Sequence, residues 1–182
     1  RTWIYMDRTV CIVGLGRLGA PIAACIASKG FNVIGFDINP DIVDMANEGS
    51  APVSEPGLDD LFAANRTRMR ATLQLSQAVL DSDMIFILVP TPSDSSGRFS
   101  LQHVAEVVTQ IGRSLRRSDR YRVIALSSTV MPGSTELEVL PILEAESGKK
   151  CGTDFGLCYN PEFVALGSVI RDFLNPDFAL IG

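Results

Sequence analysis

Short apolar runs alternate along the chain with longer stretches in which apolar residues recur every three or four positions. The short runs are typical of buried strands, and the periodic stretches are typical of helices packed on them. The expected strands are 10–13, 33–36, 84–89, 123–126 and 155–159, another begins at 178–181, and 69–72 is either a short strand or a connection. The alternation predicts an α/β fold with a doubly wound, mostly parallel sheet and helices on both faces.

The helices expected between these strands have recognisable start and stop signals. Asn39-Pro40 begins one helix that Gly49 ends, and others are expected after the turn at 54–57 and over 74–80. Helical spacing predicts a further helix from 101 to 115, whose single histidine, His103, lies off the apolar stripe and is expected to face solvent. Pro132 begins a helix whose apolar face is expected to carry Leu137, Leu140, Ile142 and Leu143.

The first strand runs into a glycine turn with the spacing Gly14-x-Gly16-x-x-Gly19. In a strand–turn–helix unit of this kind, Gly14 permits the tight turn, Gly16 lets the backbone approach a pyrophosphate, and Gly19 lets the helix pack closely on the strand. The N-terminus of the helix offers free N–H groups to the phosphates, so the intervening Arg17 and Leu18 are also expected to contact the cofactor. The turn predicts a Rossmann-type dinucleotide site.

Asp37 ends the second strand, about 20 residues after the glycines, as in other dinucleotide-binding units. A carboxylate at this place accepts hydrogen bonds from a ribose 2′-OH and repels a 2′-phosphate. The expected cofactor is therefore NAD rather than NADP.

Three further strands end in polar or proline-rich segments: Val89-Pro90-Thr91-Pro92, Ser127-Ser128-Thr129 and Asn160-Pro161-Glu162. Ligands of such sheets bind outside the carboxyl ends of the strands, so these segments should converge on one crevice. The residues expected to line the cofactor site there are Val89, Pro90, Thr91, Ser128, Thr129 and Glu162.

Each of these segments also has a purely structural explanation, because the prolines stop a strand, Thr129 could cap the helix near Pro132, and Glu162 could start a turn. Their shared location favours function. Glu162 is the carboxylate among them placed to exchange protons near a nicotinamide, and burial would raise its pKa toward neutrality. Thr129 offers a hydroxyl that could position a water.

Composition excludes several classes of function. The chain has 182 residues, of which 46% are hydrophobic and 20% charged, and this fits a globular protein with a full core. The net charge of −5 disfavours a nucleic-acid or acidic-membrane surface. With no membrane-length apolar run and no signal-peptide pattern, we expect a cytoplasmic protein. One basic run is interpreted as a solvated face at a helix end rather than a nucleic-acid site: Arg113, Arg116, Arg117, Arg120 and Arg122.

The four cysteines show no metal-ligand spacing. Cys11 and Cys25 fall on apolar faces and are expected to be small core residues, while Cys151 and Cys158 are less constrained. A disulfide is the minority expectation, and no metal site is predicted.

The chain resembles the UDP-glucose/GDP-mannose dehydrogenase family in five motifs that appear in the family's order. They are the glycine turn, Glu55-Pro56-Gly57-Leu58, Val89-Pro90-Thr91-Pro92, Ser128-Thr129-Val130, and Asn160-Pro161-Glu162-Phe163 with Gly167 and Ile170-Arg171-Asp172. The resemblance implies NAD-dependent oxidation of a nucleotide sugar's C6 alcohol to a carboxylate in two hydride transfers. It also implies that Thr129 and Glu162 handle the water and protons of the hydrolytic half. The residues implied to contact the sugar nucleotide are Phe163, Val164, Ala165, Leu166 and Gly167.

Two departures from the family pattern stand out: Leu166 replaces a glutamate, and Ser127 stands where lysine is often found. Because Leu166 removes a carboxylate from the substrate loop, the sequence does not identify the sugar. Members resembling this chain carry a nucleophilic cysteine and a catalytic lysine in later segments, and oxidation of an alcohol to an acid needs such a thiolate. We therefore expect residues 1–182 to be the NAD-binding domain of a longer enzyme, without the central and C-terminal domains, that binds NAD but does not turn over alone. The full-length enzyme is expected to be a homodimer or higher oligomer.

Two alternatives stay open. A β-hydroxyacid or 6-phosphogluconate-type dehydrogenase begins with a similar glycine turn, although the Asn160–Phe163 segment and the Glu55–Leu58 turn argue against it. A non-catalytic NAD-sensing module would share the glycine turn as well. The polar strand ends favour an enzyme over the sensor.

Overall fold

The computed structural model describes residues 8–93 and 99–182. Within them, six parallel strands form one sheet in the order β3-β2-β1-β4-β5-β6. The strands are β1 (Thr9–Val13), β2 (Asn32–Phe36), β3 (Met69–Thr72), β4 (Met84–Ile87), β5 (Val123–Leu126) and β6 (Gly156–Tyr159). The strand order reverses between β1 and β4, so the doubly wound parallel sheet is confirmed, and 69–72 is a strand.

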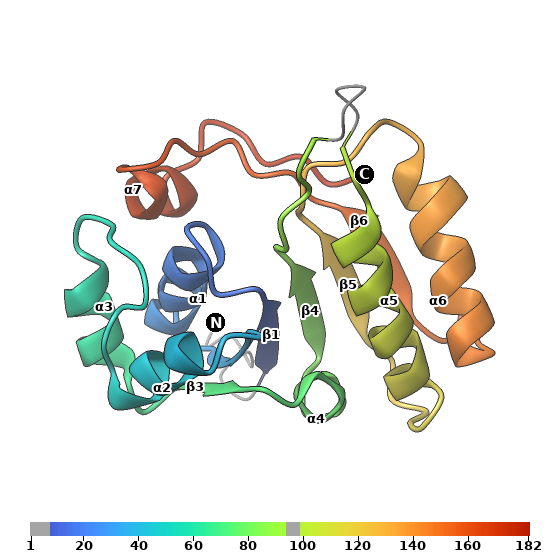
Figure 1. The fold of residues 1–182 in the computed structure, drawn as a ribbon, viewed down its shortest axis with the longest axis horizontal. Helices are drawn as coiled ribbons and strands as arrows, with labels where there is room; N and C mark the ends of the chain where they lie inside the picture. Colours follow the sequence, from blue (N-terminus) through green and yellow to red (C-terminus); the bar gives the residue numbers. More distant parts are fainter. Residues whose placement is uncertain (1–7, 94–98) are drawn as a thin grey trace, which may run out of the picture.

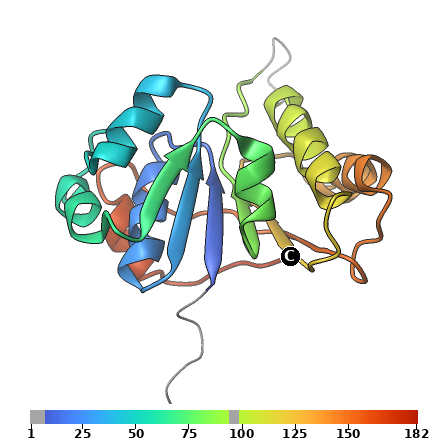
Figure 2. The same cartoon turned by 90° about the horizontal axis from the view of Figure 1, so that it is seen from below.

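Helices cover both faces of the sheet (Figures 1 and 2). They are α1 (Gly19–Ser28), α2 (Pro40–Glu48), α3 (Leu58–Asn65), α4 (Leu75–Leu80), α5 (Gln102–Leu115), α6 (Leu140–Ser147) and α7 (Val169–Leu174), with a π-helical turn, η1 (Thr135–Val139), before α6. One apolar core lies between the sheet and α4, α5 and α6, and the other lies between the sheet and α1, α3 and α7. No helix of residues 8–93 and 99–182 is long and apolar enough to cross a membrane.

The apolar runs in the sequence follow from this arrangement. In β1, Cys11 and Val13 face one core while Val10 and Ile12 face the other, because successive side chains of a strand point to opposite sides. A strand covered on both sides must be apolar at every position, and the alternation of polar and apolar residues found in half-exposed strands is absent from β1.

Two local expectations are wrong. Residues 178–181 form no strand: Gly182 exchanges two backbone hydrogen bonds with Tyr159, of 2.8 and 2.9 Å, but no ladder follows within the described residues. Leu137, expected on an apolar face, is 78% exposed. It lies in η1, and a π-helical turn holds more residues than an α-helical turn, so the face inferred from the α-helical period is displaced.

The basic run at 113–122 divides into exposed and buried members. Arg113, Arg116, Arg117 and Arg120 are exposed as expected, but Arg122 is only 2% exposed, so its assignment to a solvated face is wrong. A guanidinium is tolerated inside a protein when its donors are all used.

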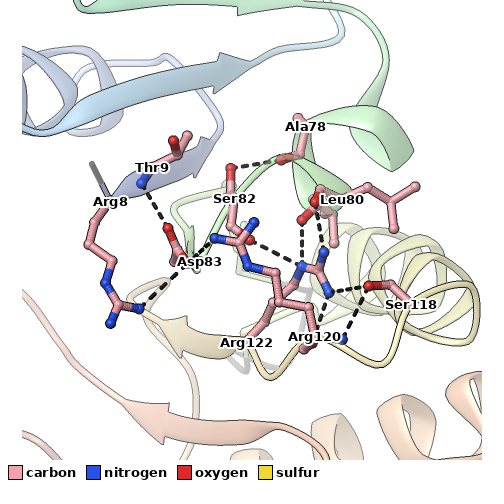
Figure 3. Close-up of polar contacts among 10 residues, drawn as sticks. Arg8, Thr9, Ala78, Leu80, Ser82, Asp83, Ser118, Arg120 and Arg122 are labelled. Carbon is pink, nitrogen blue, oxygen red and sulfur yellow. Dashed lines mark hydrogen bonds and ion pairs between the residues drawn. The ribbon is translucent and has the colours of Figure 1, made fainter.

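Figure 3 shows how the Arg122 guanidinium is held. Its Nε donates to the carbonyls of Val79 and Ser82 at 2.9 and 3.1 Å, and its Nη2 donates to that of Leu80 at 2.7 Å. Nη1 donates to the Arg120 carbonyl at 2.9 Å and to Ser118 Oγ at 3.1 Å. Arg122 therefore satisfies the carbonyl groups at the end of α4, which have no partner within that helix.

Asp83 lies beside this group and joins the amino ends of the neighbouring strands (Figure 3). Its Oδ2 accepts from the Thr9 amide at 2.9 Å, and its Oδ1 pairs with the guanidinium groups of Arg120 and Arg8. Burial opposes the charge, but the Thr9 amide and the two arginines together hold the pKa of Asp83 below its usual value. The polar groups of Asp83 and Arg122 at the amino ends of β1, β4 and β5 are thus satisfied by internal contacts.

Replacing Arg122 with methionine is expected to lower the free energy of unfolding by about 3 kcal/mol, because buried carbonyl groups lose their donors. The free energy of unfolding of Arg122→Lys should lie between those of the unsubstituted protein and Arg122→Met, since an ammonium group cannot reach all the acceptors of a planar guanidinium. Urea denaturation measures both effects. The exposed Arg116→Met is the matched control and should change the free energy by less than about 0.5 kcal/mol. An Arg122→Met effect no larger than that of the control would contradict the assignment.

Candidate functional site

The segments expected to form the site follow β1, β4, β5 and β6. All six strands are parallel, so their carboxyl ends share one edge of the sheet, at the top of Figure 1. The strand order reverses between β1 and β4, and ligands of such sheets bind at this edge beside the reversal. The sheet therefore brings the four segments to one edge.

The glycine turn after β1 is closed by two contacts that leave no room for side chains. A Cβ atom on Gly14, whose φ is +99°, would lie 2.7 Å from the Leu88 carbonyl oxygen, and one on Gly19 would lie 1.8 Å from the Gly14 carbonyl oxygen. Any larger residue at Gly19 must separate α1 from the end of β1. These two glycines are therefore required by packing.

Gly16 differs from its two neighbours in the motif, because a Cβ atom there would meet nothing within 4 Å. Among the described residues, the amides of Gly16, Arg17 and Leu18 find no acceptor. Open space over unpaired N–H groups at the start of α1 matches the requirement of a dinucleotide pyrophosphate. The residues present fit NAD at this point.

The carboxylate of Asp37 is fixed at the end of β2 by two backbone amides. Its Oδ2 accepts from Leu15 at 2.8 Å, and its Oδ1 accepts from Asn39 at 2.9 Å. Each oxygen retains capacity for a second hydrogen bond, which a ribose hydroxyl could supply. The bond from Leu15 was not anticipated from the sequence, and it makes Asp37 part of the turn as well as a ribose acceptor.

The segments after β4 and β5 are bonded to each other. Ser128 Oγ donates to the Val89 carbonyl at 2.8 Å, and the Ser127 and Ser128 amides both donate to the Ile87 carbonyl at 3.0 Å. Ser127 Oγ is buried and has no hydrogen-bond partner within residues 8–93 and 99–182. Pro90 is exposed and Thr91 half-buried beside these bonds, at the edge where the cofactor is expected.

Thr129 is exposed and does not act as a helix cap. Helical structure begins at Ser134 and Thr135 and not at Pro132 as expected, and Ser134 makes no capping hydrogen bond with its side chain. The structural explanation of Thr129 as a cap is therefore wrong, and Thr129 is an exposed residue after β5.

Glu162 is half-buried, and burial raises the pKa of its carboxyl group, as expected from the sequence. It lines an open cavity of about 430 Å³ together with Phe163, Val164 and Phe86 of β4. Ala165, Leu166 and Gly167 do not line this cavity, and neither do Ser128 and Thr129. The cavity therefore brings together only part of the expected substrate and proton-transfer residues.

The segment 163–167 has no regular secondary structure, and its side chains are largely exposed. Phe163 and Leu166 are each 59% exposed, and the Phe163 ring lies 4.7 Å from that of Phe178. The Gly167 amide donates to Glu55 Oε2 at 2.9 Å. The sequence places Glu55 in a turn and in one of the family motifs but predicts no contact for it, because no local pattern reveals a contact between residues so far apart in the chain.

None of the cysteines with a shifted pKa is suited to act as a nucleophile. Burial raises the pKa of Cys11 to about 12 and that of Cys25 to about 11, and both are core residues as expected. Burial also raises the pKa of Cys158. A thiol with a raised pKa stays protonated at neutral pH and reacts slowly.

A family model and the sequences of known proteins point to the same family. A family model described as "UDP-glucose/GDP-mannose dehydrogenase family, NAD binding domain" matches residues 8–182. The GDP-mannose 6-dehydrogenase of Azotobacter vinelandii is 39% identical over 175 residues, which cover 95% of this chain and 40% of that protein. The UDP-glucose 6-dehydrogenase AglM of Haloferax volcanii is 38% identical over 174 residues, covering 94% of this chain and 40% of that protein.

The fold is also similar to that of a relative whose structure has been solved. A ternary complex of GDP-mannose dehydrogenase from Pseudomonas aeruginosa superposes with a TM-score of 0.93 at 38% identity, covering 96% of this chain and 40% of that one. The chain thus spans about 40% of the length of the curated relatives it matches.

The geometry of the glycine turn predicts that Gly16 and Gly19 respond differently to alanine. Gly16→Ala should leave the unfolding free energy unchanged and weaken NAD binding by about tenfold or more, because the new methyl group occupies the space over the free amides. Gly19→Ala should lower the unfolding free energy by about 3 kcal/mol. Urea denaturation and calorimetric NAD titration measure the two effects. Equal destabilisation by both changes, or normal NAD binding by Gly16→Ala, would disprove this division of roles.

Proposed function

The chain belongs to the UDP-glucose/GDP-mannose dehydrogenase family as its NAD-binding domain, and from this we propose that it serves a nucleotide-sugar 6-dehydrogenase. The proposed enzyme oxidises the C6 alcohol of a nucleotide sugar to a carboxylate. Its relatives named after GDP-mannose and UDP-glucose are 39% and 38% identical to the chain, so the proposal names the class of nucleotide sugars and not one member.

The observation that carries the proposal is the position of Glu162. Its carboxyl group has a raised pKa, lines a cavity of about 430 Å³, and follows β6 at the same edge of the sheet as the glycine turn. A carboxylate with a raised pKa exchanges protons effectively near neutral pH. A cofactor site alone would need no such group at this edge of the sheet.

The cofactor-binding residues divide into three proposed roles. Gly16, Arg17 and Leu18 would hold the pyrophosphate, and Asp37 would hold the ribose. Four residues would line the nicotinamide side of the site: Val89, Pro90, Thr91 and Ser128. When bound, NAD supplies the chemistry of hydride acceptance.

Proton and water handling is assigned to Glu162 and Thr129. Conversion of one alcohol to one carboxylate releases two hydrides and three protons and consumes one water. Glu162 would accept protons, and the hydroxyl of Thr129 would orient the water. Phe163 to Gly167 would contact the sugar nucleotide from the adjoining loop.

We also propose that residues 1–182 act as the cofactor domain of a longer enzyme. The covalent step needs a thiolate, and the raised pKa values of Cys11, Cys25 and Cys158 argue against each of them. A nucleophile from another part of the enzyme would complete the site. We also propose a homo-oligomer, which the family resemblance implies, and a cytoplasmic location, which is the expectation from the sequence.

The test uses the enzyme from the complete reading frame, supplied with NAD and either GDP-mannose or UDP-glucose. We expect two NADH for each carboxylate formed, and no turnover by the 182-residue chain alone. Glu162→Gln should lower kcat by about a hundredfold. In the unsubstituted enzyme kcat should fall as pH drops through the raised pKa of Glu162, because the proton acceptor becomes protonated. In Glu162→Gln this fall of kcat at acidic pH should be absent.

Glu106→Gln is the matched control, since Glu106 is 58% exposed on α5. It should behave as the unsubstituted enzyme. Turnover by the isolated chain, or failure of the full enzyme to oxidise either sugar nucleotide, would refute the proposal.

A further inference from the structure

The side chain of Glu55 contacts two backbone amides near the start of α7. This helix covers the second apolar core, which lies between the sheet and α1, α3 and α7. Its Oε2 accepts from the Gly167 amide at 2.9 Å, and its Oε1 accepts from the Val169 amide at 2.8 Å. Both carboxylate oxygens are used, and hydrogen bonds to a charged acceptor are stronger than neutral ones. A single side chain thus holds two points of the segment that leads from the 163–167 loop into α7.

The backbone that carries Glu55 is itself anchored. The Leu58 amide donates to the Glu55 carbonyl at 3.1 Å, and Leu58 is 1% exposed within the second core. The turn between them uses Gly57 at a φ of +79°, a conformation that favours glycine. In Figure 1 the segment before α3 rises toward α7, and both helices pack against α1. The backbone that carries the Glu55 carboxylate is therefore fixed in position by the turn and by the buried Leu58.

The loop between Pro161 and Ser168 has few other restraints. Asp172 of α7 accepts from the Ala165 amide at 3.3 Å and from Ser168 Oγ at 2.7 Å, but these contacts are local. Within the described residues, the bond from Gly167 to Glu55 is the hydrogen bond that ties this loop to a distant part of the chain. Besides this bond, the loop is held by its two ends at β6 and α7, by the packing of Val164 on the second core, and by the contact of the Phe163 ring with that of Phe178.

We propose that Glu55 is a positioning residue that sets the geometry of the 163–167 loop for the nucleotide sugar. The inference rests on the proposed function, because that function assigns the sugar nucleotide to this loop. Glu55 acts through the loop backbone and not on NAD, whose expected contacts lie at the glycine turn and Asp37. It should therefore control the affinity for the nucleotide sugar separately from that for NAD.

Glu55→Gln tests this with minimal change in shape. An amide has one oxygen and places an NH₂ donor against a backbone N–H donor at one of the two contacts. In the enzyme from the complete reading frame, KM for the oxidised sugar nucleotide, GDP-mannose or UDP-glucose, should rise by about tenfold or more, as expected for a lost charge-assisted hydrogen bond. KM for NAD should change by less than about twofold, and most of the loss should appear in KM rather than in kcat.

Asp60→Asn is the matched control, because Asp60 is exposed in the first turn of α3 and the change removes the same charge nearby. It should leave every kinetic constant unchanged. A fall confined to kcat, an equal rise in KM for NAD, or a loss of thermal stability with unchanged kinetic constants would each overturn the role of Glu55.

A second measurement separates this inference from the proposed function. In the 182-residue chain, hydrogen exchange at the Gly167 and Val169 amides should become about tenfold faster in Glu55→Gln and stay unchanged in Asp60→Asn. If the unsubstituted enzyme oxidises neither sugar nucleotide, the proposed function fails and the positioning role fails with it, while faster exchange would still establish the contact. Unchanged exchange in Glu55→Gln would overturn the inference even if the enzyme is active.

Discussion

The close approach of α1 to the end of β1 is the constraint on which the site depends. A Cβ atom on Gly19 would lie 1.8 Å from the Gly14 carbonyl oxygen, so the helix starts where it does only because both positions lack side chains. Next to that contact, the amides of Gly16 to Leu18 have no acceptor within the described residues, and the space at Gly16 is open. The Leu15 amide lies 2.8 Å from Asp37 and joins the turn to the second strand. One steric requirement therefore places both the amides proposed to hold the pyrophosphate and the carboxylate proposed to hold the ribose.

The two edges of the sheet differ in how their polar groups are satisfied. At the amino edge, Arg122 and Asp83 use their donors and acceptors on neighbouring backbone and side chains. At the carboxyl edge, the turn amides are unpaired within the described residues, and burial raises the pKa of Glu162. Stability and function are thus separated along the strands: one end is internally bonded, and the other keeps groups available for a ligand.

Local patterns were enough to predict most of the fold. Fully apolar strands such as 10–13 and 123–126 follow from burial on both faces, and the glycine spacing with Asp37 identifies the cofactor unit. Leu137 was misplaced because a π-helical turn changes the period, and Arg122 because its five acceptors come from several segments. The role of Glu55 depends on amides 112 and 114 residues away. Such features depend on tertiary packing, which single-sequence periodicity does not contain.

The central claim is that the carboxylate of Asp37, held beside the glycine turn, makes this domain a site for NAD. Calorimetric titration of the unsubstituted chain with NAD and with NADP tests it most directly. We expect NAD to bind and NADP to bind more than about tenfold more weakly, because its 2′-phosphate meets a fixed negative charge. Equal or tighter binding of NADP would contradict it.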